Sequence, residues 1–223
     1  MKKRHLVPLV AATLGAFAVP ASVAAPAAPT VTRVASASTP TGTRSLAAVL
    51  TSDGDRFDRN WYDYDIVTEA VLAVIAADTD ANSPVRLLTG GSVPLTAFIP
   101  NDRAFQVLVK DLTGQWVRTE SEVFAAVASL GIDTVEDVLL YHVVPGATIT
   151  ARDALRSNGA ELTTALGPTI GVKVPSRFLP IIVLRDQDPN DVDPVVNPFA
   201  LDINRGNAQI AHGITFVLRP ADL

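Results

Sequence analysis

The sequence predicts an α+β fold, in which most helices precede most strands. Four segments between residues 63 and 144 repeat apolar residues at helical spacing. Five short apolar or β-branched runs are broken by Gly and Pro, and four of these runs follow residue 160. Because the two kinds of segment do not alternate, the pattern favours α+β over a parallel α/β sheet.

The first two predicted helices cover residues 67–75 and 105–112. In both, apolar residues recur at positions i, i+3, i+4 and i+7, which places them on one helical face. A side chain that can cap the helix stands just before each of them. The candidate caps are Asp63 or Asp65 for the first helix and Asn101 or Asp102 for the second.

The third predicted helix, residues 123–130, follows Thr119 and Glu122, which are spaced as a capping box. Gly131 is placed to end this helix. The fourth predicted helix, residues 134–142, carries valines, a leucine and a histidine on one stripe. A Val-Val-Pro-Gly sequence ends it, because proline disfavours helical geometry at the residue before it.

The predicted strands are short, and one long connection separates the last two. Residues 185–207 are rich in Asp, Asn and Pro and show no apolar period, so they predict a long loop. The predicted strands are Leu95–Ile99, Leu162–Leu166, Thr169–Val174, Phe178–Leu184 and Ile214–Leu218.

The composition excludes several classes of protein. The chain has 223 residues and a net charge of −5, with 18 Lys and Arg against 23 Asp and Glu. This balance argues against nucleic-acid binding, which depends on Lys and Arg to neutralise phosphates. There is no cysteine, so disulfides, thiolate metal sites and cysteine nucleophiles are excluded. No nucleophile elbow, phosphate loop, dinucleotide fingerprint or zinc-protease motif occurs, and we therefore expect no enzymatic activity.

The N-terminal segment predicts export. Residues 1–4 are basic, residues 6–19 are almost wholly apolar, and small residues follow, which is the order of a secretory signal peptide. The apolar run is shorter than the ~20 residues that span a membrane, and an uncleaved anchor is the alternative. We predict a signal peptide over residues 1–27, a flexible leader over 28–43 and one domain over 44–223. The exported protein is then secreted or associated with the cell envelope, with no membrane span.

Three segments together resemble the fasciclin domain family. Residues 95–105 (LTAFIPNDRAF) resemble its first signature, residues 139–146 (LLYHVVPG) its Tyr-His segment, and residues 207–220 its closing signature. The three segments occur in the family's order and at roughly its usual separation. The signature positions are Thr96, Phe98, Pro100, Asn101, Phe105, His142, Pro145, Gly146 and His212.

The resemblance implies a twisted β-sandwich or wedge flanked by helices. It also implies an extracellular binding or adhesion protein, whose partner is an extracellular protein or a polysaccharide. Animal members have been tied to receptor binding through the Tyr-His region, which makes Tyr141 and His142 candidate partner contacts. The chain departs from the family pattern at Thr215, where Asp is usual, and in the longer stretch 185–207.

His142, His212 and Tyr141 each have two interpretations. The two histidines remain after signal removal, and they are candidates for a metal-ligand pair or a general base. His142 lies on an apolar stripe, however, so we expect a buried, neutral ring that bonds to backbone or to Asn101. Tyr141 is either a core aromatic with a bonded hydroxyl or a partner contact.

One eight-residue stretch of the predicted loop contains four carboxylates, those of Asp186, Asp188, Asp191 and Asp193. They are candidate partner contacts, and such dense oxygen ligands also suit Ca²⁺. The spacing lacks the EF-hand glycine and terminal glutamate, so a solvated acidic loop is the competing interpretation. If the loop binds calcium, the alternative function is a calcium-binding structural or scavenging envelope protein that uses residues 185–207. We expect no other cofactor. A second acidic group consists of Asp53, Asp55 and Asp58.

Overall fold

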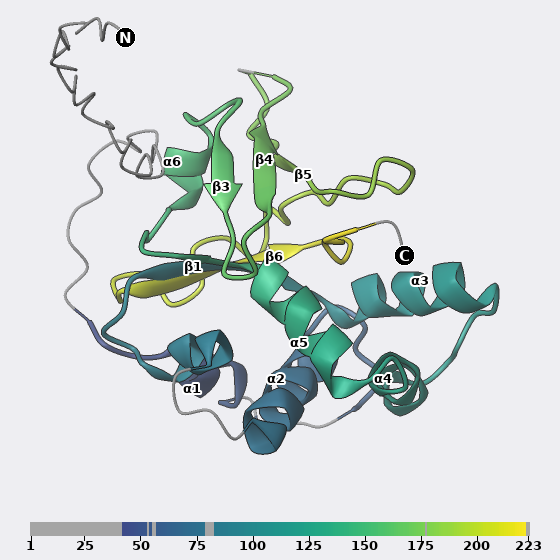
Figure 1. Ribbon diagram of the computed structural model, residues 1–223. Coiled ribbons are helices and arrows are strands. Elements are labelled where there is room, and N and C mark those ends of the chain that lie inside the picture. The colour runs from purple at the N-terminus through teal and green to yellow at the C-terminus, as the bar shows by residue number, and fades with distance from the viewer. Residues whose placement is uncertain (1–41, 53, 55–56, 79–82, 177, 222–223) are drawn as a thin grey trace, which may run out of the picture. The chain divides into compact units, whose positions relative to one another are not determined.

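The computed structural model describes residues 42–52, 54, 57–78, 83–176 and 178–221 (Figure 1). The predicted signal peptide, and the leader up to residue 41, lie outside these residues. The helices are α1 (Leu46–Leu50), α2 (Asp65–Ala77), the 3₁₀ helix η1 (Pro84–Thr89), α3 (Asp102–Thr113), α4 (Glu120–Ala128), α5 (Ile132–Tyr141) and α6 (Ala151–Ala154). The strands are β1 (Leu95–Pro100), β2 (Val143–Pro145), β3 (Glu161–Thr163), β4 (Thr169–Lys173), β5 (Val183–Arg185) and β6 (Gln209–Ile214). None of the described helices is long and apolar enough to cross a membrane.

The strands form two three-stranded sheets. In the first sheet, of order β2-β1-β6, β1 pairs antiparallel with β2 and parallel with β6, which places Leu95 opposite Gln209 and Pro100 opposite Ile214. The second sheet, of order β3-β4-β5, is antiparallel throughout. The predicted mixture of helices and strands is therefore confirmed. The predicted sandwich is not confirmed, because neither small sheet closes.

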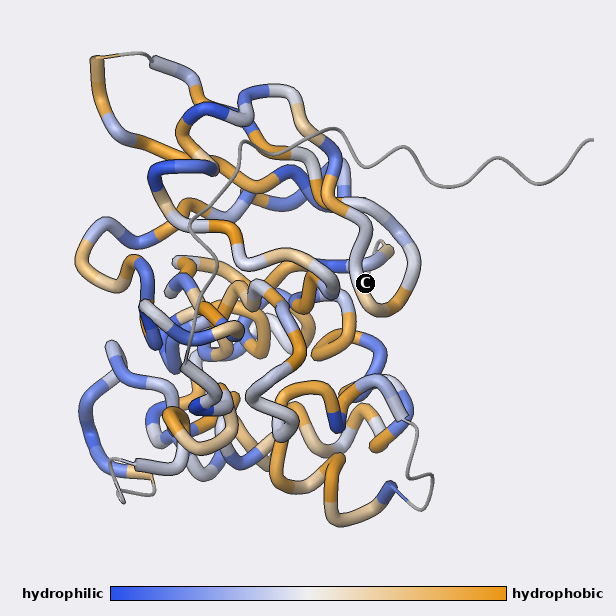
Figure 2. The backbone as a smooth tube through the Cα atoms, turned by 90° about the vertical axis from the view of Figure 1, so that its left-hand side faces the viewer, coloured by the Kyte–Doolittle hydropathy of each residue, from blue (hydrophilic) through white to orange (hydrophobic). Residues whose placement is uncertain are grey.

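The first sheet lies between the helices α1–α5 and the second sheet (Figure 1). Leu95, Ala97 and Ile99 pack among the helices, whereas Phe98 packs against residues of the second sheet. This alternation follows from the period of two along a strand, and it explains why all six residues of β1 are buried. In Figure 2 the apolar segments run through the helices and central strands. The apolar positions of the signature segments predict that Phe98, Phe105, Leu139, Val143, Ile214 and Val217 are buried in one core. All six are buried, but Phe98 and Ile214 belong to the cluster beside the second sheet, and the other four belong to the cluster among the helices.

Two helix starts differ from the prediction. Helix α2 begins at Asp65 after Tyr64, which makes no capping side-chain bond, and the Ile66 N–H donates instead to Asp102 Oδ1 at 2.9 Å. The cap thus comes from the start of another helix rather than from Asp63 or Asp65. Helix α5 begins at Ile132 instead of residue 134, because Gly131 takes up a positive φ of 93° and serves as its N-cap.

Three predicted strands have different limits. The closing strand β6 covers Gln209–Ile214 rather than Ile214–Leu218, since residues 209–214 pair with β1. Strand β5 starts only at Val183, and Phe178, predicted to lie in it, is 87% exposed. Strand β3 ends at Thr163 rather than at residue 166. The sequence prediction missed α1, η1, β2 and α6, which are all short.

Candidate functional site

The Tyr141–His142 pair closes helix α5 and is enclosed by the fold. The Tyr141 side chain is fully buried, and its hydroxyl donates to the carbonyl of Thr169 at 2.9 Å. His142 Nδ1 lies 2.7 Å from the carbonyl of Val138, and the Leu218 N–H donates to His142 Nε2 at 3.0 Å. These partners fix a neutral tautomer in which Nδ1 carries the proton.

Burial lowers the pKa of His142 to about 4, because removal of water disfavours the charged ring. The predicted enclosed, neutral imidazole is therefore confirmed. Of the two predicted kinds of partner, backbone is confirmed and Asn101 is not, since the Asn101 side chain accepts from the Ala104 N–H at 3.0 Å and caps α3. A partner can reach neither Tyr141 nor His142 unless this part of the fold opens, and partner binding by the pair stays a prediction.

His212 is held in the same way, on β6. Its Nε2 lies 2.9 Å from the carbonyl of Ile149, and the Asp202 N–H donates to its Nδ1 at 3.3 Å. Burial lowers the pKa of His212 below its usual range. Among the described residues, neither histidine belongs to a group of side chains that converges as metal ligands would. Both rings join separate segments of backbone.

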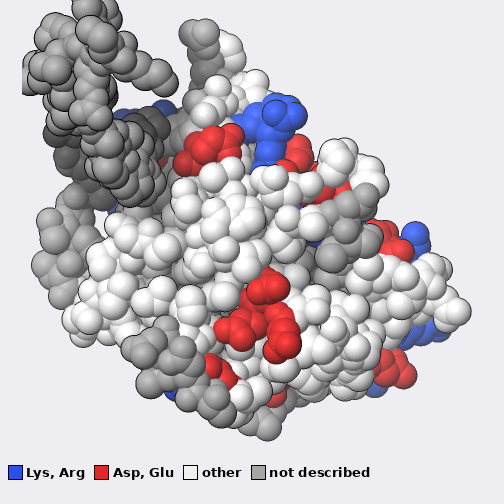
Figure 3. Space-filling model, in the orientation of Figure 1, with Lys and Arg blue, Asp and Glu red and all other residues white. Residues whose placement is uncertain are grey.

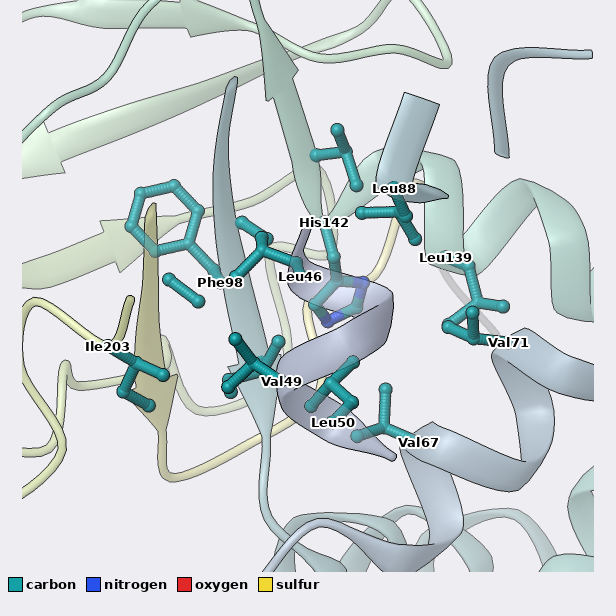
Figure 4. Close-up of a pocket in the computed structure, with 14 residues that line it drawn as sticks. Leu46, Val49, Leu50, Val67, Val71, Leu88, Phe98, Leu139, His142 and Ile203 are labelled. Atoms are coloured by element: carbon teal, nitrogen blue, oxygen red, sulfur yellow. The ribbon is translucent and has the colours of Figure 1, made fainter. Parts of the chain in front are cut away.

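A small apolar cavity lies beside His142 (Figure 4). Its volume is about 30 Å³, and Leu46, Val71, Phe98 and Leu139 are among the residues that line it. The lining is apolar apart from the edge of the imidazole, whose nitrogens are already bonded to backbone. A water held there would lack the polar partners that it needs, and a larger polar ligand does not fit.

Three of the four aspartates of the 185–207 loop contact Arg219, which the sequence analysis did not single out. Arg219 Nη1 lies 3.2 Å from Asp188 Oδ2, and its Nε lies 3.1 Å from Asp191 Oδ2. Its Nη2 lies 3.0 Å from Asp111 Oδ2 on α3, while its backbone N–H donates to Asp186 at 2.8 Å. The guanidinium is mostly buried, so the chain itself supplies the cation at the centre of this loop.

The outer side of the same loop forms an open acidic cleft with the second sheet. The cleft has a volume of about 380 Å³ and carries the side chains of Glu161, Asp186, Asp188, Asp191, Asp193 and Arg185. Arg185 lies 3.9 Å from Asp193 and is exposed, so it neutralises the cleft only in part. Burial, and then the charge of Asp186, raises the pKa of Asp191 to about 6. This arrangement suits a cationic group, and calcium binding in the loop stays a prediction.

The comparisons with known proteins agree with the sequence signatures. The fasciclin domain family matches residues 69–179. The resemblance to fasciclin domains is confirmed. The solved structure of a FAS1 domain pair from the insect cell adhesion molecule Fasciclin I has a TM-score of 0.51 and 17% sequence identity. The similarity covers 78% of this chain and half of that chain, and at this identity it shows the fold alone. No curated protein matches the sequence.

The fasciclin match includes the Tyr-His pair but not the acidic loop. Within the match, Thr96 joins two segments, since its hydroxyl donates to the carbonyl of Ala147 and accepts from the Ile149 N–H, both at 2.8 Å. The four loop aspartates and Arg219 lie beyond residue 179. Four of the five carboxylates of the acidic cleft therefore lie outside the matched residues, and only Glu161 lies within them.

Another group of acidic residues was not recognised from the sequence, which named Asp63, Asp65 and Asp102 only as candidate helix caps. Asp63, Asp65, Asp102 and Glu120 lie near one another where helices α2, α3 and α4 begin. Burial, and then a hydrogen bond with Asp63, raises the pKa of Asp102 to about 8. Burial, and then the charges of Asp63 and Asp58, raises the pKa of Glu120 to about 7. The signal in the sequence was an acidic residue at the start of three successive long helices.

Proposed function

We propose that the chain is a secreted or envelope-associated binding and adhesion protein that acts through its acidic cleft and without catalysis. The fasciclin match supports this, because fasciclin domains are associated with cell adhesion, and the similar insect structure belongs to a cell adhesion molecule. The observation that carries the proposal is the open cleft of about 380 Å³, which is lined by five carboxylates. Arg219 contacts three of them from inside, and Arg185 is the exposed cation of the cleft.

A partner with exposed Lys or Arg side chains fits this cleft best. Complementary charge steers association and disfavours partners of the same sign. The face shown in Figure 3 carries several patches of acidic side chains, so anionic polysaccharides are disfavoured there. Val192, which is 64% exposed between two of the aspartates, adds an apolar contact at the rim. We therefore choose a basic segment of an extracellular protein as the partner.

The double variant Glu161→Gln/Asp193→Asn is expected to weaken binding of an oligo-lysine peptide about tenfold, because it removes two carboxylates from the cleft wall. Neither residue contacts Arg219, so the loop should keep its structure. The matched control is Asp133→Asn/Asp137→Asn, which removes two exposed charges from α5. Calorimetry at two salt concentrations, with calcium and with chelator, measures the affinities.

Equal weakening in both double variants would mean that only net charge matters, and the cleft would not be the site. Beads coated with the protein should adhere to surfaces that present basic extracellular proteins, and the cleft variant should lose this adhesion. Adhesion to a neutral polysaccharide that survives in the cleft variant would contradict the choice of partner. Binding that requires calcium would support the calcium-binding alternative.

Export is tested separately. The exported protein is expected to begin after Ala24 or Ala27, because a small residue stands two positions before each of them. N-terminal sequencing of protein recovered outside the cell measures this directly. Exported protein that begins at Met1 would show that the segment is not a cleaved signal.

A further inference from the structure

Three helices begin at one place, and each begins with an acidic residue. Asp65 is the first residue of α2, Asp102 of α3 and Glu120 of α4. The three helices pack against one another. Asp63 is common to two groups of neighbouring carboxylates. The first group is Asp63, Asp65 and Asp102, and the second is Asp58, Asp63 and Glu120. The helix-start cluster, as we call these five residues, thus gathers carboxylates that are up to 62 positions apart in the sequence.

Among the described residues, none donates a hydrogen bond to the carboxylate of Glu120. Its residue is 1% exposed, and both of its oxygens are buried without a donor. The Asp58 N–H lies close by, but it is not in hydrogen-bonding geometry with either oxygen. Asp63 Oδ1 and Asp102 Oδ2 are also buried, but these two carboxyls are joined to each other by a hydrogen bond, so Glu120 carries the inference. Because a buried polar atom without a partner costs free energy, the Glu120 oxygens point to a ligand that the described part of the chain does not supply.

The helix starts themselves do not balance this charge. Each helix N-terminus acts as roughly +0.5 of an elementary charge, so three of them offset fewer than two carboxylates. In the part of the chain that the structure describes, no Lys or Arg forms an ion pair with Asp63, Asp102 or Glu120. Arg103, which follows Asp102 in the sequence, stacks on Trp116 at 4.9 Å, and Arg59, which follows Asp58, is exposed. The carboxylates of Asp63 and Glu120 therefore favour a cation.

The geometry points to a calcium site formed by Asp58, Asp63 and Glu120, and we propose that the protein binds Ca²⁺ there. Each of the three carboxylates offers an oxygen within 4.8 Å of the other two. Two oxygens on opposite sides of a calcium ion are about 4.8 Å apart, so one ion can reach all three. Asp58 is exposed, Asp63 is half-buried and Glu120 is buried, which leaves one side open for entry and for water ligands. Calcium tolerates such an irregular set of oxygens better than Mg²⁺, which demands near-ideal octahedral geometry.

Glu120→Gln is expected to weaken calcium binding at least about tenfold, because it removes the buried charge at the inner end of the site. Titration calorimetry of the exported chain with CaCl₂ measures the affinity, which should lie in the range of about 10⁻⁴–10⁻³ M for an extracellular site. Calcium should also raise the melting temperature of the wild-type protein, and this rise should be lost in the variant. The matched control is Glu122→Gln on the same turn of α4, where the exposed side chain keeps an oxygen to accept from Thr119.

Should Glu120→Gln fail to fold, Asp58→Asn removes an exposed ligand of the same site with little risk to the core. Calcium binding that is lost in the site variants and kept in Glu122→Gln supports the proposal. Calcium binding that is unchanged in the site variants overturns it and places the ion elsewhere, with the 185–207 loop as the next candidate. The absence of binding to the wild-type protein at millimolar calcium overturns it as well. None of these outcomes depends on the basic partner of the acidic cleft.

Discussion

Replacing Arg219 with Met is expected to destabilise the protein by about 3–5 kcal/mol. The guanidinium holds two nearly buried carboxylates, since the side chains of Asp188 and Asp191 are 1% and 9% exposed. Met retains most of the apolar volume of the arginine, so the loss comes mainly from buried charges left without a partner. Urea denaturation at neutral pH measures the change in the free energy of unfolding. The 185–207 loop should also become more sensitive to proteolysis, because Arg219 connects it to α3 through Asp111.

Arg185→Met is the matched control. The Arg185 side chain is 66% exposed and lies 3.9 Å from a half-exposed Asp193, so its removal should change stability by less than about 1 kcal/mol. A similar small change in Arg219→Met would mean that the loop does not depend on its buried cation. The acidic residues would then be solvated as an ordinary surface loop, and the cleft would lack a fixed shape.

The role of Arg219 could not be read from the sequence, because its partners are remote from it. Asp111 is 108 positions away, and Asp188 is 31 positions away. The density of aspartates in the loop was visible, but a dense group of acids predicts a calcium ion and an internal arginine equally well. Only the folded chain shows that the loop turns back to the residue just before the final proline.

Local signals explain which elements were predictable. The helices α2, α3 and α4 carry their apolar period and, for α3 and α4, their caps within a few residues, so their positions were predicted closely. Strands depend on their neighbours, and β6 is placed by its pairing with β1 rather than by its own apolar residues. Val217 and Leu218 are apolar because they pack in the core, although they lie outside the ladder.

The candidate site also divides into features with a local signal in the sequence and features that depend on remote residues. The apolar stripe of α5 predicted that His142 is enclosed, and one of its partners, the Val138 carbonyl, lies one turn away. The other partner, the Leu218 N–H, comes from the far end of the chain and had no local signal. For the helix-start cluster, the sequence shows an acidic residue at each helix start, but it does not show that the three helix starts meet.

Acid is expected to destabilise the protein through His142 by up to about 3 kcal/mol between pH 6.5 and pH 4. Burial lowers the pKa of the folded ring from 6.5 to about 4, so the unfolded chain takes up the proton first. The stabilisation is therefore complete above pH 6.5 and is lost as the pH falls towards 4. His212, whose pKa burial also lowers, adds in the same direction. Glu120 and Asp102 act in the opposite direction, since their raised pKa values favour the folded state as the pH falls.

The variant His142→Ala separates the pH-dependent contribution of His142 to stability from those of His212, Glu120 and Asp102. At pH 7 the variant should be about 1–3 kcal/mol less stable than the parent, because the Leu218 N–H loses its acceptor and packing is lost. The difference should shrink as the pH approaches 4, since the parent then loses the stabilisation that the variant already lacks. The control is Val138→Ala on the same stripe, which has no titrating group and should show a difference from the parent that is independent of pH. Urea denaturation of the three proteins between pH 4 and pH 8 measures these differences. If the free energies of unfolding of His142→Ala and the parent differ by the same amount at every pH, the ring is not held neutral by burial.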